Sequence, residues 1–100
     1  MQFMLIAYDD TDEGALGRRL AVREAHLRSA KEMFVQGKMV YGAGILDDAG
    51  SMIGSMIIYD ASSRSELEQW LSKDPYVTGK VWKTMTIHRA QVPPFCIERK

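Results

Sequence analysis

The sequence predicts a single α+β domain in which a four-stranded antiparallel sheet carries two helices on one face. Its 100 residues are 46% apolar and 26% charged, as in an ordinary globular domain. Short apolar runs alternate with two stretches whose apolar residues recur at helical spacing. No repeat or linker divides the chain, so we expect one domain over residues 1–100, with a tail from about residue 93.

The first half of the chain supplies two strands and a long helix. Residues 3–8 are apolar throughout and predict a strand that is buried on both faces. From about residue 16 to residue 36 the apolar period becomes helical, and Gly37 is a plausible helix stop. Residues 39–46 predict the second strand, in which Gly42 and Gly44 suggest a bend or a close backbone approach.

The second half again begins with a strand that is followed by a helix. Residues 47–50 form a hairpin-type connection to a third strand over residues 52–60. Ser63 and Glu66 make a capping-box pattern that opens a second helix. That helix ends before Pro75, because the residue that precedes a proline is disfavoured in the α region.

The last strand completes a recognisable order. Residues 81–91 predict a fourth strand, which Pro93 ends. The order β-α-β-β-α-β suits a ferredoxin-like sandwich with both helices on one face of the sheet. The strands are too apolar for their other face to stay in water, so we expect a second copy of the chain to cover it.

Charge and cysteine usage exclude several classes of protein. The 13 basic and 13 acidic residues balance, which argues against a nucleic-acid binder or a polybasic membrane binder. No apolar stretch approaches the roughly 18 residues that span a bilayer, and residues 1–10 do not resemble a secretory signal. Cys96 is the only cysteine and makes no intramolecular disulfide. We therefore expect a cytoplasmic protein, and one whose near-neutral surface permits self-association.

The first predicted helix carries arginines where apolar residues are expected. At 100° per residue, Arg23 falls in the middle of the apolar stripe, and Arg19 and His26 fall on its edge. A buried arginine is costly unless an acceptor compensates its charge. Arg23 could extend past the edge of the stripe, form a buried ion pair, or meet an anionic ligand in a cavity. The stripe itself consists of Leu16, Leu20, Leu27, Ala30 and Phe34.

The two histidines show no metal-site spacing. A lone histidine such as His26 is more often structural than functional, and His88 on the last strand reads as a surface residue. No Cys or Glu joins them in a ligand motif, so we expect no metal site.

Three segments together resemble one known family. They are R-L-A-V-R-E-A-H-L over residues 19–27, the glycine-bearing stretches over 37–46, and D-P-Y-V over 74–77 with the following Trp82. In this pattern the chain resembles the YciI-like proteins, which have a YCII-related domain. One departure is Gly44-Ile45, where many members have Gly-Pro.

This resemblance implies a fold and a site. It implies a dimeric α/β barrel, related to muconolactone isomerases and to small cofactor-free monooxygenases, with His26 and Asp74 as the catalytic pair. Similarity to a dehydrochlorinase of chlorinated hydroxyhydroquinone implies proton transfer on small aromatic or lactone-like compounds. Imidazole exchanges protons near neutral pH, and an aspartate can orient it. Arg19, Arg23 and Tyr76 would then bind the substrate.

Three hypotheses about function remain open on the sequence alone. The first is an isomerase-type or lyase-type enzyme without a cofactor, in which His26 acts as general acid and base and Asp74 orients it. The second is a non-catalytic module that binds a small metabolite through Arg23. The third is a dimer without a ligand, in which these residues only form an ion network. In each case we expect a homodimer, or a higher oligomer built from it.

Overall fold

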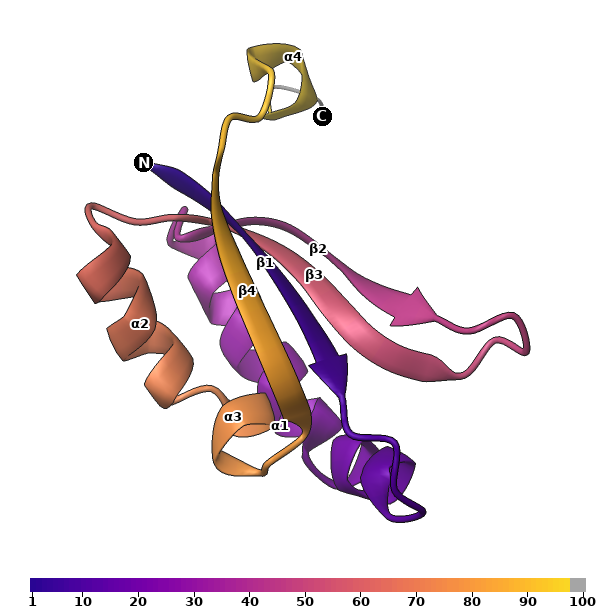
Figure 1. Cartoon of the computed structure of the whole chain (residues 1–100). Helices are drawn as coiled ribbons and strands as arrows, with labels where there is room; N and C mark the ends of the chain where they lie inside the picture. Colours follow the sequence, from indigo (N-terminus) through magenta and orange to yellow (C-terminus); the bar gives the residue numbers. More distant parts are fainter. Residues whose placement is uncertain (98–100) are drawn as a thin grey trace.

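A computed structural model describes residues 1–97 as an antiparallel four-stranded sheet covered by helices on one face (Figure 1). The strands lie in the order β2-β3-β1-β4, and all three neighbouring pairs are antiparallel. The predicted ferredoxin-like sandwich is confirmed, and each predicted strand lies within about two residues of its place. The strands are β1 (Gln2–Asp9), β2 (Met39–Leu46), β3 (Met52–Asp60) and β4 (Trp82–Ala90).

Two main helices and one short helix lie against the same face of the sheet. They are α1 (Ala15–Val35), α2 (Arg64–Ser72) and α3 (Pro75–Thr78). A fourth helix, α4 (Pro94–Ile97), follows β4 in the segment predicted as a tail, and lies beyond the end of the sheet (Figure 1). None of the helices within residues 1–97 has a stretch long and apolar enough to cross a membrane.

The core lies between the sheet and its helices. Alternate side chains of β1 and β3 point toward the helices, as the period of two in a strand requires. Ser63 begins α2 as predicted, because its hydroxyl accepts a hydrogen bond from the Glu66 N–H at 3.1 Å. The buried apolar residues are Phe3, Leu5, Ala7, Ile57, Tyr59, Ala61, Leu67, Leu71, Tyr76, Val81 and Trp82.

The opposite face of the sheet is uncovered in the single chain. Met4 and Ile6 of β1, and Met56 and Ile58 of β3, alternate with the core residues and are only half-buried. Tyr41 on β2, paired with Ile58, is 58% exposed. Within one chain β1 is therefore buried on one face and not on both, which corrects the interpretation of residues 3–8.

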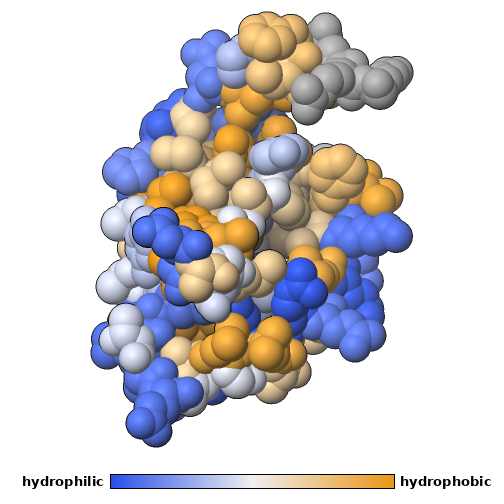
Figure 2. Space-filling model, turned by 90° about the vertical axis from the view of Figure 1, so that its right-hand side faces the viewer, coloured by the Kyte–Doolittle hydropathy of each residue, from blue (hydrophilic) through white to orange (hydrophobic). Residues whose placement is uncertain are grey.

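The buried face of α1 differs from the predicted stripe. The residues it buries are Ala15, Arg19 and His26, whereas most of the predicted leucine stripe is exposed. On the helical wheel the buried face lies roughly 80° from the stripe. Two polar side chains occupy it because each has a partner inside the fold, which apolar periodicity cannot indicate. The exposed residues of the stripe are Leu16, Leu20, Leu27 and Phe34. On one side of the molecule, Figure 2 shows apolar areas that lie between charged ones.

Candidate active site

The candidate active site is built around a histidine and an aspartate that lie far apart in the sequence. His26 projects from the buried face of α1, and Asp74 lies in the turn between α2 and α3. His26 Nδ1 lies 2.8 Å from Asp74 Oδ1, and both side chains are more than nine-tenths buried. The sequence alone leaves open whether these two residues meet within one chain or between two. The structure brings them together in a single chain.

Local structure holds the Asp74 carboxylate in place. Asp74 is the N-cap of α3, and its Oδ1 accepts a hydrogen bond from the Tyr76 backbone N–H at 2.8 Å. Pro75 occupies the first helical position, where its missing N–H costs nothing. The sequence Asp-Pro-Tyr therefore forms a compact cap, and the same oxygen that caps α3 faces His26.

The hydrogen bonds also determine which nitrogen of His26 is available for chemistry. Oδ1 of an ionised Asp74 is an acceptor only, so His26 Nδ1 must be the donor of their shared hydrogen bond. In the neutral ring, Nε2 then carries the free lone pair. An imidazole held in this tautomer can accept a proton at Nε2, and the carboxylate stabilises the cation that forms.

Two aromatic side chains fix the plane of the His26 ring. Tyr76 stacks on the imidazole with the ring centroids 3.8 Å apart and the planes 12° from parallel. Trp82 meets the imidazole edge-on, with its centroid 5.8 Å away. Rotation of the His26 ring would break these contacts together with the Asp74 hydrogen bond, so the imidazole is positioned before any ligand arrives.

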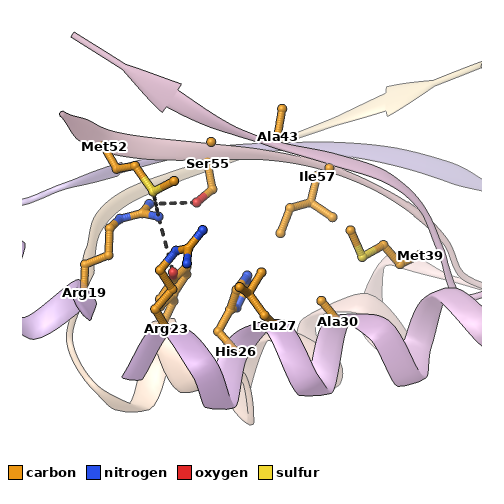
Figure 3. A pocket seen from close by; sticks show the side chains of 13 residues that line it. Arg19, Arg23, His26, Leu27, Ala30, Met39, Ala43, Met52, Ser55 and Ile57 are labelled. Carbon is orange, nitrogen blue, oxygen red and sulfur yellow. Dashed lines mark hydrogen bonds between the residues drawn. The ribbon is translucent and has the colours of Figure 1, made fainter. Parts of the chain in front are cut away.

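A cavity of about 150 Å³ lies between α1 and the sheet, and His26 lines it. Figure 3 shows Arg23 rising from α1 toward the strands, between Arg19 and His26. Arg23 is half-buried, and no ion pair or side-chain hydrogen bond joins its guanidinium to another residue within 1–97. This side chain therefore offers positive charge to whatever enters the cavity.

Arg19 also lines the cavity, but its guanidinium is fully engaged inside the chain. It is 2% exposed and forms a two-point ion pair with Asp9, from Nε to Oδ2 at 2.7 Å and from Nη2 to Oδ1 at 3.2 Å. It also donates to Ser55 Oγ at 2.8 Å and to Tyr76 Oη at 3.3 Å. Arg19 is therefore bound on all sides by residues of the chain, whereas Arg23 has no such partner within residues 1–97.

Two glycines of β2 make room for the cavity. Gly42 and Gly44 both line it, and a Cβ at Gly42 would lie 2.6 Å from Met39 Cε. A Cβ at Gly44 would lie 3.4 Å from Met52 Cε, which is ordinary van der Waals contact. At Gly42 the neighbour that approaches closely is a side chain, and Gly44 has ordinary contacts, so the close backbone approach suggested for these glycines is not observed. Side chains larger than alanine here would project into the cavity.

The charges around Tyr76 act on its phenol in opposite directions. Burial raises the pKa of Tyr76, and the positive charges of Arg19 and Arg23 lower it in part. The net shift is upward, so the phenol of Tyr76 keeps its proton at neutral pH and is a hydrogen-bond donor.

The remaining candidates lie outside the site. His88 is exposed on β4, on the uncovered face of the sheet, as predicted. Cys96 is an exposed free thiol in α4. Within residues 1–97, no three His, Cys, Asp or Glu side chains cluster in the way a metal site requires.

Sequence reasoning missed three residues of the site: Asp9, Ser55 and Trp82. Asp9 and Ser55 were not singled out, and Trp82 was named only as part of a motif. A signal existed for Ser55, because strand alternation places it on the same face as Ile57 and Tyr59. A hydroxyl at a core position needs a polar partner, and here Arg19 supplies it.

A comparison with known protein families gives one match that covers most of the chain. The family described as YCII-related domain matches residues 1–91. The chain belongs to this family. This YCII-related chain is 27% identical over 93 residues to Protein YciI of Escherichia coli O6:H1 and to Protein YciI of Shigella flexneri. Each match covers 87% of this chain and 93% of the relative.

Solved structures share the fold. The chain is similar to 5-chloro-2-hydroxyhydroquinone dehydrochlorinase from Burkholderia phenoliruptrix, determined in complex with 2,5-dihydroxybenzoquinone, with a TM-score of 0.79 and 24% identity. That match covers 95% of this chain and 98% of the other. A protein from Mycobacterium tuberculosis is also similar, with a TM-score of 0.57 and 13% identity over 93% of this chain and 98% of that one.

Proposed function

We propose that this protein is an enzyme of the isomerase or lyase type that moves protons on a small anionic ring compound. The observation that supports this most directly is the buried 2.8 Å hydrogen bond between His26 Nδ1 and Asp74 Oδ1 at the wall of a cavity. His26 Nε2 would take a proton from the substrate and return it, and Asp74 would hold the imidazole and stabilise its charged form. Arg23 would bind the anionic group.

The cavity has room for a single-ring compound. A cavity of about 150 Å³ is known to hold one benzene ring. The relative that acts on 5-chloro-2-hydroxyhydroquinone handles a single-ring compound with several oxygens. A monocyclic compound with an acidic hydroxyl or carboxylate therefore suits both the volume and the charge of Arg23.

The experiment is a proton-exchange assay with a histidine control. Single-ring phenols, hydroxyquinones and lactones are incubated with the protein in D₂O, and incorporation of deuterium or conversion is followed by NMR. His26→Asn should lower the rate by about 10²- to 10⁴-fold, as expected for loss of a general acid–base group. The matched control is His88→Asn, since His88 is the other of the two histidines and does not line the cavity.

Two outcomes would overturn the proposal. Equal rates for the wild-type protein and His26→Asn would remove His26 from the chemistry. Tight binding of a compound with neither exchange nor conversion across the panel would favour a metabolite-binding module, which needs Arg23 but no proton-accepting histidine.

We infer that the protein acts as a homodimer whose copies meet through the uncovered face of the sheet. That face presents Met4, Ile6, Met56 and Ile58, which are half-buried and apolar. Ile58→Glu should shift the wild-type dimer to monomer in analytical ultracentrifugation, whereas Leu20→Glu on the exposed side of α1 should not. A monomeric wild-type protein would overturn this inference, and dissociation by Leu20→Glu alone would place the interface on α1.

A further inference from the structure

Arg19 holds two hydroxyl groups in the wall of the cavity. Its Nη2 donates to Ser55 Oγ at 2.8 Å, and its Nη1 donates to Tyr76 Oη at 3.3 Å. The ion pair with Asp9 fixes the guanidinium from the other side. A guanidinium has five N–H donors and no acceptor, so neither hydroxyl can donate to Arg19. Both must point their own hydrogens away from it.

The Ser55 hydroxyl has no lone pair left for a ligand. Its oxygen accepts from Arg19 Nη2 and also from Trp82 Nε1 at 3.3 Å. A hydroxyl has two lone pairs and one hydrogen, so both lone pairs are occupied and only the hydrogen remains to be used. Within residues 1–97 no acceptor for that hydrogen lies in hydrogen-bond range. Ser55 is 4% exposed, so bulk water does not readily provide one.

The Tyr76 hydroxyl also has a hydrogen without an acceptor in the described part of the chain, although its oxygen accepts one hydrogen bond and not two. Its oxygen accepts from Arg19, its side chain is 2% exposed, and no acceptor for its hydrogen is present within residues 1–97. The upward shift in the pKa of Tyr76 keeps the hydrogen on the phenol at neutral pH. Ser55 and Tyr76 both line the cavity. Buried hydroxyl hydrogens in folded proteins are nearly always bonded to an acceptor, and the cavity that both residues line is where a ligand could supply one.

We propose that Ser55 and Tyr76 form a hydroxyl pair that donates two hydrogen bonds to one carbonyl or enolate oxygen of a ligand, with Arg19 as the residue that orients both. This inference deepens the proposed function and rests on it for the chemical step. The ligand must offer an acceptor oxygen to the hydroxyl pair and a negative charge to Arg23. A hydroxyquinone anion, or another cyclic enolate of one ring, combines both features within about 150 Å³.

The hydroxyl pair explains how His26 would remove a proton from carbon. His26 Nε2 takes the proton from the carbon next to the carbonyl, and the electron pair of that C–H bond forms a C=C bond. The π electrons of the C=O bond move onto the oxygen, where the two O–H donors stabilise the developing charge. When the enolate is conjugated with a further C=C bond, Nε2 returns the proton to the far carbon of that bond. The C=O bond then re-forms and the remaining C=C bond lies between the α and β carbons, which completes an isomerisation.

The test uses 2,5-dihydroxybenzoquinone as the probe, with the wild-type protein and two variants. Ser55→Ala and Tyr76→Phe each remove one hydroxyl group, and Tyr76→Phe keeps the ring that stacks on His26. Calorimetric titration should give a Kd about five- to tenfold weaker for each variant, as expected for the loss of one hydrogen bond. Ser65→Ala, at an exposed position on α2 that does not line the cavity, is the matched control and should bind like the wild-type protein.

A vibrational readout distinguishes direct contact from a structural effect. Hydrogen bonds weaken a C=O bond, so the carbonyl band of the bound probe should move to lower frequency in the wild-type protein. The shift should shrink in Ser55→Ala and Tyr76→Phe and persist in His26→Asn. A wild-type band at the position of the free probe, or an unchanged band and Kd in both hydroxyl variants, would overturn the proposal, as would no binding of the probe to the wild-type protein.

The two proposals fail in different ways. If the hydroxyl variants lose affinity and band shift while no compound is converted, the hydroxyl pair stands and the enzymatic function fails. If His26→Asn abolishes conversion while both hydroxyl variants bind the probe normally, the acid–base function stands and the hydroxyl pair fails.

Discussion

Replacing Asp9 by Asn should destabilise the protein more than any change to an exposed ion pair. The Asp9 and Arg19 side chains are 5% and 2% exposed, and Arg19 Nε lies 2.7 Å from Asp9 Oδ2. At an effective dielectric constant of about 20, two unit charges at that distance attract by about 6 kcal/mol before desolvation is counted. Removing one partner of a buried pair leaves the other charge uncompensated, which costs about 3–5 kcal/mol.

That loss is large for a domain of this size. Total stability is typically about 5–15 kcal/mol, and each kcal/mol moves the melting temperature of a 100-residue domain by about 4 °C or more. Asp9→Asn should therefore lower Tm by about 12 °C or more. Arg19→Met should be similarly destabilising, and the double variant should lose less than the sum by about 2 kcal/mol or more, because the two residues interact directly.

The assay is urea and thermal unfolding followed by tryptophan fluorescence, at one fixed protein concentration because self-association adds to stability. Asp12→Asn is the matched control, since Asp12 forms an exposed ion pair with Arg18 nearby in the chain. Solvent screens such a pair, so its loss should leave Tm almost unchanged. A Tm for Asp9→Asn within about 2 °C of the wild-type value would refute the reasoning about the buried pair. So would a double variant whose loss of unfolding free energy equals the sum of the losses in Asp9→Asn and Arg19→Met.

Three further predictions concern packing, pH and cavity volume. Gly54→Ala should cost about 1–3 kcal/mol in urea unfolding, because the added Cβ would lie 2.4 Å from the Ala7 carbonyl oxygen, whereas Gly17→Ala in α1 has open space and should be stabilising. Burial, with the Asp74 charge, raises the pKa of Tyr59, so the unfolded chain loses this proton near pH 10 while the folded chain keeps it. The free energy of unfolding should then fall as pH rises above about 10, and a Tyr59→Phe variant with the same stability slope would contradict this. Gly44→Val should fill part of the cavity and weaken the binding of 2,5-dihydroxybenzoquinone at least about tenfold, with little change in Tm. An unchanged affinity would show that the probe binds elsewhere.

The fold was largely predictable because each element has a local signal. Apolar runs marked the strands, Ser63 and Glu66 marked the start of α2, and a short acidic turn marked the β2–β3 hairpin. Local signals could not orient α1, because Arg19 and His26 occupy its buried face. Their burial depends on partners that lie elsewhere in the sequence, and apolar periodicity assigns such residues to the surface.

The candidate site was also only partly predictable from the sequence. His26 and Asp74 were named through a resemblance between motifs, and neither spacing nor composition would have paired residues 48 positions apart. Asp9 was missed because an aspartate at the end of a strand usually belongs to a turn. Only the three-dimensional structure shows that Asp9 compensates Arg19 and leaves Arg23 as the cation that faces the cavity without an ion pair within residues 1–97.

The two hydrogen bonds accepted by Asp74 Oδ1 have a consequence for comparing related chains. One bond starts the α3 helix and the other joins that helix to His26 on α1, so the same atom contributes to folding and to the candidate site. A descendant that lost its chemistry would still be under selection to keep this aspartate for its fold. Retention of the aspartate in a related sequence is therefore weak evidence of activity. Loss of the histidine, which caps no helix, would be the earlier and clearer sign that activity had been abandoned.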